Sequence, residues 1–241
     1  MTDLIARFLK IAVVNFSGNV GKSTLTKHLF APRLPDCQVI PVESINASSV
    51  DGEKVSGKHF KRVIEEMALH GNVVVDIGSS NIELAFAQLK NLDDAHEDFD
   101  YFVVPCVPDK KQQHDTLELL TRLQEIGVPG SKIKVILNYV PQDEVPESLF
   151  PSVLGYCSEM GIGWATVYYN EVFELLVGST VDQAAANLDD VTARIKEIQA
   201  MPGDEQDKNE LRQLASVRTT ARLAKGVKKQ FDETFRTLFN E

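Results

Sequence analysis

The stretch Asn15-Phe16-Ser17-Gly18-Asn19-Val20-Gly21-Lys22-Ser23-Thr24 decides the fold of this chain. It follows a short apolar run typical of a buried strand, and it leads into a segment that we expect to be helical. A glycine-containing turn between a strand and a helix is the context that a phosphate-binding loop requires. Gly18 and Gly21 permit backbone angles that other residues avoid, so successive N–H groups can point inward around a phosphate.

The side chains of this loop have separate expected roles. We expect Lys22 to reach the β- and γ-phosphates of a nucleotide, the Ser23 hydroxyl to ligate magnesium, and Thr24 to contact the α-phosphate. The other binding residues of the loop are Ser17, Gly18, Asn19, Val20 and Gly21. The alternative is a connection whose glycines only shape a turn. The Gly-Lys-Ser-Thr sequence, the upstream glycine and the flanking elements together favour the phosphate site.

Short apolar runs rich in β-branched residues recur along the chain at intervals too long for hairpins. They cover residues 10–15, 39–42, 73–76, 101–105, 133–138 and 164–168. Continuous apolar runs are typical of strands that are buried on both faces. The segments between them show helical spacing, as in Phe60, Val63, Ile64 and Met67. The pattern predicts an α/β fold with a doubly wound, mostly parallel sheet.

The strand pattern stops after Tyr168. Residues 170–177, 182–200 and 207–239 have the composition of helices, separated by Gly178-Ser179 and by Met201-Pro202-Gly203. We therefore expect a nucleotide-binding domain over residues 1–180 and a C-terminal helical extension, packed on it, over residues 181–241.

The composition is that of a globular protein. The chain has 241 residues, of which 43% are hydrophobic, and a net charge of −10. Its longest apolar run near the start is only four residues, Ile11 to Val14, which excludes a membrane-spanning segment there. From residues 1–10 we expect no secretory signal, and the spacing of Cys37, Cys106 and Cys157 predicts free thiols in a reducing cytoplasm.

One segment departs from the acidic average. Residues 211–231 contain six basic residues and no Asp or Glu. On a helix, four of them fall within a stripe about 60° wide, namely Arg218, Arg222, Lys225 and Lys229. The simpler interpretation is an amphipathic helix with a solvated basic edge, and the sharper one is a non-specific contact with the DNA backbone.

The spacing of the glycines indicates a particular family. An ordinary Gly-x-x-x-x-Gly-Lys-Ser loop would have its first glycine at Phe16. A glycine at position 18 instead resembles the deviant loop of the ParA/MinD P-loop ATPases, Lys-Gly-Gly-x-Gly-Lys-Ser/Thr. The resemblance places Ser17 where that family has its signature lysine, which reaches across a nucleotide-sandwich dimer. Lys110 and Lys111 are candidates to replace the missing cation.

Two strand ends fit the same resemblance. Asp76 ends an apolar strand and is followed by Gly78, which looks like a Walker B strand whose carboxylate holds a magnesium-bound water; alone it would equally be a turn. The resemblance implies that Asn138 binds the base edge, although a turn residue is also typical there. Pro141 stands where GTPases carry an aspartate, which favours adenine. Tyr169 and Asn170 would cover the base.

The second strand departs from the family pattern. Family members carry Asp-x-Asp there, whereas this chain has Val42-Glu43-Ser44-Ile45-Asn46. Glu43 is the candidate to stand in for a catalytic carboxylate beside Lys22 and Asp76, or it is a structural strand-end residue. With Ser17 and this segment both altered, we expect slow or partner-dependent hydrolysis of ATP.

The resemblance implies an ATP- and magnesium-dependent molecular switch in the bacterial cytoplasm. Within the family, the loop and the chain length resemble StbB-type plasmid-stability ATPases, which act in plasmid maintenance and conjugative transfer. The expected partners are a second copy in a nucleotide-dependent homodimer and a DNA-binding plasmid protein. A membrane-surface role is disfavoured, because the apolar face of the basic helix is expected to pack on the core. Two alternatives stay open: a nucleotide-binding module without hydrolysis, and a carboxylate-activating ATP-dependent ligase.

Overall fold

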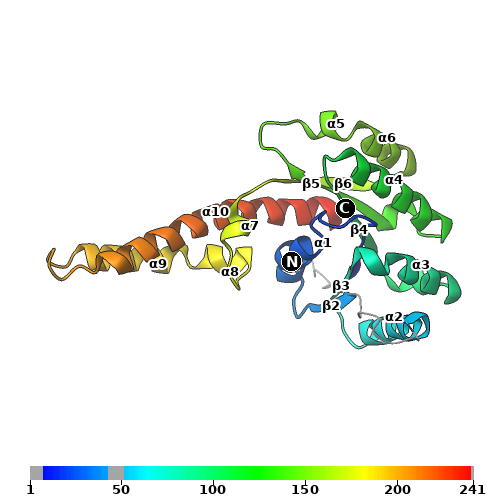
Figure 1. The fold of residues 1–241 in the computed structure, drawn as a ribbon, viewed down its shortest axis with the longest axis horizontal. Helices are drawn as coiled ribbons and strands as arrows, with labels where there is room; N and C mark the ends of the chain where they lie inside the picture. Colours follow the sequence, from blue (N-terminus) through cyan, green and yellow to red (C-terminus); the bar gives the residue numbers. More distant parts are fainter. Residues whose placement is uncertain (1–7, 43–51, 240–241) are drawn as a thin grey trace, which may run out of the picture. The chain divides into compact units, whose positions relative to one another are not determined.

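The computed structural model describes residues 8–42 and 52–239 (Figure 1). The strands are β1 (Lys10–Val13), β2 (Gln38–Val42), β3 (Val73–Ile77), β4 (Tyr101–Cys106), β5 (Ile133–Val140) and β6 (Gly163–Tyr168). The longer helices are α2 (Gly52–Ala68), α3 (Ile82–Asn91), α4 (Lys110–Glu125), α6 (Pro151–Met160), α9 (Leu188–Gln199) and α10 (Lys208–Phe239). Shorter helices are α1 (Lys22–Leu25), α5 (Pro146–Leu149), α7 (Val172–Leu175) and α8 (Val181–Ala186).

All six strands form one parallel sheet in the order β2-β3-β1-β4-β5-β6. The predicted doubly wound parallel sheet is therefore confirmed. The chain starts near the middle of the sheet, moves outward to β2 on one side, and then crosses β1 to build the other side. This reversal between β1 and β4 is the position at which open α/β sheets bind ligands, beyond the carboxyl ends of their strands.

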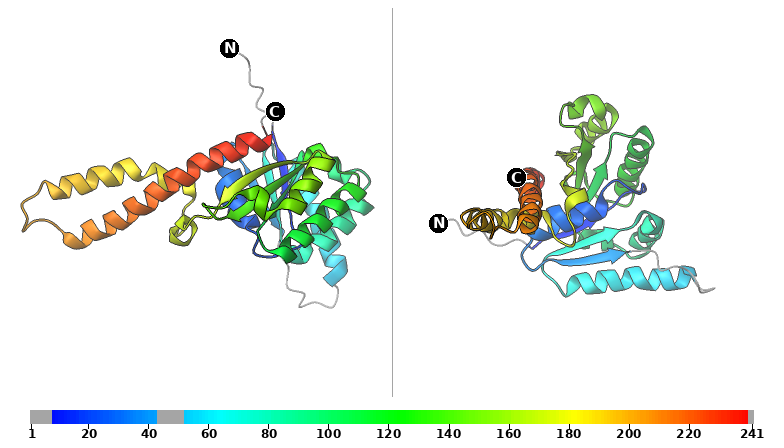
Figure 2. Two further views of the ribbon diagram at one scale, coloured as in Figure 1. Left: turned by 90° about the horizontal axis from the view of Figure 1, so that it is seen from above. Right: turned by 60° about the vertical axis from the view of Figure 1, so that its left-hand side comes forward.

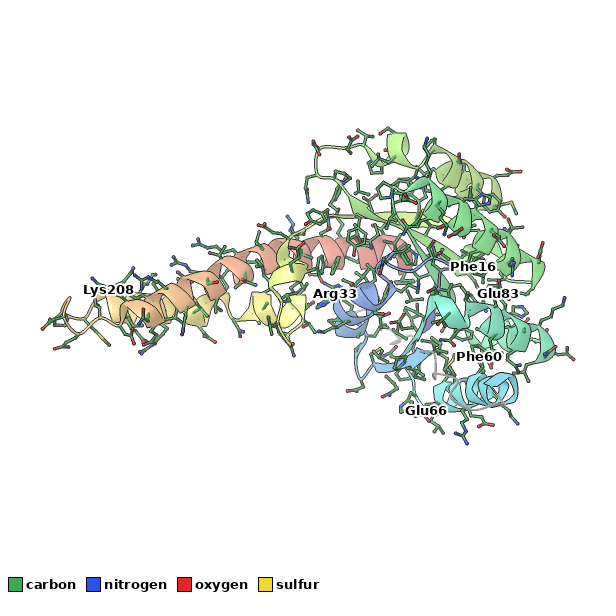
Figure 3. All side chains as sticks on the ribbon, viewed as in Figure 1. Phe16, Arg33, Phe60, Glu66, Glu83 and Lys208 are labelled. Atoms are coloured by element: carbon green, nitrogen blue, oxygen red, sulfur yellow. The ribbon has the colours of Figure 1, made fainter. Side chains whose placement is uncertain are left out.

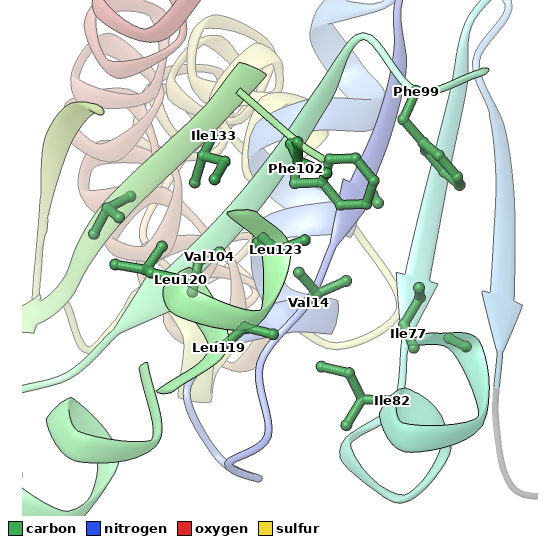
Figure 4. Packing of buried hydrophobic residues seen from close by; sticks show 14 of the residues in the cluster. Val14, Ile77, Ile82, Phe99, Phe102, Val104, Leu119, Leu120, Leu123 and Ile133 are labelled. Atoms are coloured by element: carbon green, nitrogen blue, oxygen red, sulfur yellow. The ribbon is translucent and has the colours of Figure 1, made fainter. Parts of the chain in front are cut away.

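The sheet is covered on both faces, as its apolar strands require (Figure 2). One face packs against α2, α3, α4 and α6, and buries residues such as Val14, Phe102 and Leu120 (Figure 4). The other face is covered by α1, which continues directly into a π-helix, η1 (Thr26–Phe30). On this face the ring of Phe239, at the end of α10, packs 6.1 Å from the ring of Phe30 in η1.

Two compact units divide the chain. The first holds the sheet and extends to Tyr169, with Thr234 and the residues after it, and the second spans Asn170–Glu233. The predicted helix 182–200 is two helices, α8 and α9, which meet at Asn187.

Local contacts stabilise the second unit. Thr180 and Gln183 form a capping box at the start of α8. Within the same unit, Arg194 donates to Glu210 at 2.9 Å and Lys228 lies 3.7 Å from Asp182. In residues 8–42 and 52–239, no helix has both the length and the apolar content to cross a membrane.

Candidate functional site

The loop after β1 is fastened by a buried asparagine. The Nδ2 atom of Asn15 donates to the Pro105 carbonyl at 2.8 Å and to the Thr116 hydroxyl at 2.9 Å, while its Oδ1 atom accepts from the Ser17 N–H at 2.8 Å. Asn15 is completely buried, so these bonds are shielded from water. Sequence reasoning assigned it no role, although a polar residue at the end of an apolar strand was the available signal.

The loop adopts the backbone angles that let amides point inward. Asn19 has φ +56° and Gly21 has φ +89°, and Lys22 then begins the helical segment. A Cβ atom on Gly21 would collide with the side-chain amide of Asn138. Gly21 is therefore required both by its left-handed backbone and by the neighbour packed against it. The following N–H groups lie at a helix start, where they are available to an anion.

Lys22 is held inside the loop. Its Nζ atom donates to the Ser17 carbonyl at 2.7 Å and to the Asn15 carbonyl at 3.3 Å, and the residue is only 8% exposed. Burial lowers the pKa of Lys22, and the carboxylate of Asp76 acts in the opposite direction. The loop therefore holds a buried ammonium group on two of its own main-chain carbonyls.

Asp76 faces this cation from the adjacent strand. It stands opposite Val13 in the register of β1 and β3, and it is largely buried. Gly78 follows it and donates its N–H to the Val42 carbonyl at 3.0 Å. Ser23 is exposed at the start of α1. A hydroxyl and a carboxylate are oxygen donors of the kind that Mg²⁺ prefers, so the residues present fit that ion.

Ser17 is engaged with α4. Its hydroxyl donates to Asp115 at 2.5 Å, and Lys111 Nζ donates to the same carboxylate oxygen at 3.3 Å. The hydrogen bond from Ser17 is the main cause of a lowered pKa at Asp115, and Lys111 adds to it. Asp115 is a site residue that sequence reasoning missed. Beside it lies a pocket of about 430 Å³, lined by Phe16, Ser17, Gly18, Asn19, Asp109, Lys111 and Gln112.

Phe16 joins the loop to two helices. Its ring lies 6.1 Å from the ring of Phe86 on α3, and the guanidinium of Arg122 on α4 lies 4.9 Å from its centroid. Arg122 also donates to Glu83 and to Glu118, each at 2.8 Å. Figure 3 labels Phe16 and Glu83 on this side of the sheet. A movement of the loop at Phe16 would therefore change its contacts with α3 and α4.

The end of β5 contacts the same loop. Asn138 Nδ2 donates to the Val20 carbonyl at 2.9 Å, so the residue expected to bind the base edge also fastens the loop. The N–H of Tyr169 donates to Val140 at 2.8 Å, which places the start of the following segment beside β5. Asn170 belongs to the second unit, where its side chain accepts the N–H of Val172 at 2.9 Å.

The remaining candidates lie elsewhere. Glu43 falls outside the described residues. Arg222, Lys225 and Lys229 are exposed on α10 and Arg218 is half-buried, and none of the four has an ion pair with another described residue. Their positive charge is therefore not neutralised within the described part of the chain.

Replacing Gly21 tests the loop geometry. We predict that Gly21→Ala lowers the free energy of unfolding by about 1–3 kcal/mol, because it strains the backbone and displaces Asn138. Gly155→Ala is the matched control: that glycine lies inside α6 with free space around it, so alanine should stabilise by about 0.5–1 kcal/mol. Urea unfolding measures both. Equal stability of the two variants would contradict the geometry.

Removing the Ser17 hydroxyl tests its bond to Asp115. We predict that Ser17→Ala raises the pKa of Asp115 toward its ordinary value of 3.8, measured by NMR titration of its carboxyl carbon. A depressed folded-state pKa stabilises the fold above the unfolded-state pKa, and this contribution is lost as pH falls through the folded-state pKa. The variant should therefore be less stable at neutral pH and approach the parent in acid. An unchanged titration curve refutes the assignment.

Comparison with known proteins shows a shared fold. No protein-family model matches the sequence, and no curated protein matches it significantly. Apo McdA from Cyanothece is 10% identical with a TM-score of 0.50, covering 69% of this chain and 88% of that one. The cell division protein MinD from Aquifex aeolicus is 15% identical with a TM-score of 0.45, and the match covers 69% of this chain and 85% of MinD. An ATP complex of a Cyanothece McdA variant is 12% identical with a TM-score of 0.44, covering 90% and 96%. The likeness to McdA supports the fold expected from the resemblance to ParA/MinD ATPases.

Proposed function

We propose that this protein is an ATP-binding molecular switch that hydrolyses its nucleotide slowly. The observation that carries the proposal is the loop after β1, in which the Lys22 ammonium lies on two loop carbonyls at a helix start. A polyphosphate would replace those carbonyls as the partner of Lys22 and would meet the N–H groups that follow. The protein resembles the ParA/MinD type in both loop sequence and fold, which supports the same function.

Magnesium would be held by Ser23 and Asp76. Bound there, it would neutralise phosphate charge. The residues of the chain supply the rest: Lys22 holds the phosphates from inside the loop, Thr24 lies one residue further along α1, and Asn15 keeps the loop in place. Pro141 provides no carboxylate for guanine, so adenine is the proposed base.

The hydrogen bond from Ser17 to Asp115 favours slow hydrolysis of ATP. The Ser17 hydroxyl is hydrogen-bonded to Asp115, and Lys111, which donates to the same carboxylate, lines the pocket beside the loop. With Ser17 neutral and Lys111 bonded to Asp115, neither side chain supplies a free positive charge to a phosphoryl-transfer transition state. The same observation supports a second candidate function, a binding module that holds ATP without cleaving it.

We further propose a role in plasmid maintenance, partition or conjugative transfer, as in the StbB-type proteins that the loop resembles. Nucleotide binding would favour a homodimer, and hydrolysis would release it. A DNA-binding plasmid protein is the proposed partner that senses this state. The unneutralised stripe Arg218, Arg222, Lys225 and Lys229 would contact DNA without sequence preference.

Exchange of Lys22 tests nucleotide binding. We predict that Lys22→Ala weakens Mg-ATP binding by about 100-fold, because a charged hydrogen-bond donor to the phosphates is lost. Lys27→Ala removes an exposed lysine from the same helical segment and should bind as the parent does. Equilibrium dialysis with labelled ATP measures the affinity of the parent and of both variants. Equal affinities of Lys22→Ala and the parent would contradict the proposal. Turnover by the parent separates a hydrolysing switch from a binding module.

Charge reversal on α10 tests the DNA contact. We predict salt-sensitive binding of duplex DNA that Arg218→Glu combined with Lys225→Glu abolishes, because each lost phosphate contact removes about one unit of the salt-dependence slope. The matched control is the double variant Lys196→Glu, Lys208→Glu. It changes the net charge by the same amount at exposed positions outside the stripe, and it should still bind DNA. Anisotropy at several salt concentrations measures the effect. Unimpaired binding by the first variant would exclude the stripe.

A further inference from the structure

The backbone at Tyr139 is exceptional for its residue type. Among the described residues, four that are not glycine have positive φ, and three of them are Asn19, Asp36 and Asp94. Asparagine and aspartate tolerate this region, because their short polar side chains bond locally. Tyr139 is the fourth, with φ +57°. An aromatic residue in this conformation costs about 1–2 kcal/mol, so the surrounding structure must impose it.

A β-bulge imposes it. Leu137 pairs with Thr166 and Val140 pairs with Tyr168, so two residues of β5 stand opposite the single Val167 of β6. Bulges redirect side chains, and they are common beside functional sites. Here the bulge contains Asn138 and Tyr139, directly at the end of β5 that faces the phosphate-binding loop.

The bulge directs Tyr139 to the loop. An ideal Cβ atom on Gly21 would lie 3.7 Å from Cε2 of the tyrosine ring, and the residue is still 41% exposed. One edge of the ring therefore lies close to Gly21, while much of the residue remains open to solvent. Its neighbour Asn138 is buried, and its Nδ2 donor is used on the Val20 carbonyl. One of its two amide N–H groups is therefore used on the loop, whereas the exposed part of the Tyr139 ring is open to an aromatic contact.

We propose that Tyr139 is the stacking platform for the nucleobase and sets the preference for a purine nucleotide. This inference rests on the proposed nucleotide-binding function. A base attached to phosphates in the loop would pack on the exposed part of the tyrosine ring, and a purine offers a larger π-surface than a pyrimidine. The strained backbone is thus retained because it aims the ring at the loop.

The test compares a ligand with a base to one without. We expect Tyr139→Ala to weaken Mg-ATP binding by about 10-fold, with Mg-tripolyphosphate binding within about twofold of the parent. Tyr139→Phe keeps the ring and should bind both as the parent does. The parent should also prefer ATP to CTP, and Tyr139→Ala should lose most of that preference. Calorimetric titration measures each pair.

A purely structural role for Tyr139 predicts a different result. If the tyrosine only supported the loop, Tyr139→Ala would weaken ATP and tripolyphosphate equally, which would overturn the proposal. So would an alanine variant that binds ATP as tightly as the parent. Tyr139→Gly relieves the positive φ, so it should fold at least as stably as Tyr139→Ala and show the same selective loss. Failure of the parent to bind either ligand would instead refute the nucleotide-binding function itself.

Discussion

The hydrogen bonds that hold the loop after β1 are the constraint on which the site depends. Asn15 fixes the start of the loop to β4 and α4, and Asn138 fixes its end to β5. Between them, Lys22 lies on carbonyls of the loop itself. These bonds are buried, so each is worth more than it would be in water, and losing one would leave a polar group unsatisfied. The conformation of the loop is thus fixed by neighbouring elements as well as by Gly21.

The fold could be predicted from the sequence because its signals are local. Apolar runs such as Val73–Val75 specify buried strands, and the glycine-containing turn specifies the strand–loop–helix unit. The contacts that complete the site are not local. Asn138 meets Val20 across 118 positions and Ser17 meets Asp115 across 98. No spacing rule reports such pairs, and so the engagement of Ser17 with Asp115 and the bulge at Tyr139 became evident only in the structure.

The loop has two sides with different chemistry. On the inner side, the Lys22 ammonium and the Asp76 carboxylate lie near enough to influence each other, and they are the groups proposed to hold phosphate and magnesium. On the outer side, the neutral hydroxyl of Ser17 and the Lys111 ammonium of α4 both donate to Asp115. This division is the basis of the proposed switch, in which phosphate binding is combined with slow hydrolysis. Phe16 contacts Phe86 on α3 and Arg122 on α4, so it links the position of the loop to the positions of these helices.

Amide-resolved NMR of the whole protein tests most directly whether main-chain N–H groups hold the phosphates. On addition of Mg-ATP, the amide protons of residues 18–24 should shift downfield and exchange more slowly with solvent, since each gains a charged acceptor. Amides of α6 should change little, because the loop's hydrogen bonds to other described elements go to β4, α4 and β5 and none of them goes to α6. If saturating Mg-ATP leaves the resonances of residues 18–24 unmoved in a folded sample, the loop is not a phosphate site and the account is wrong.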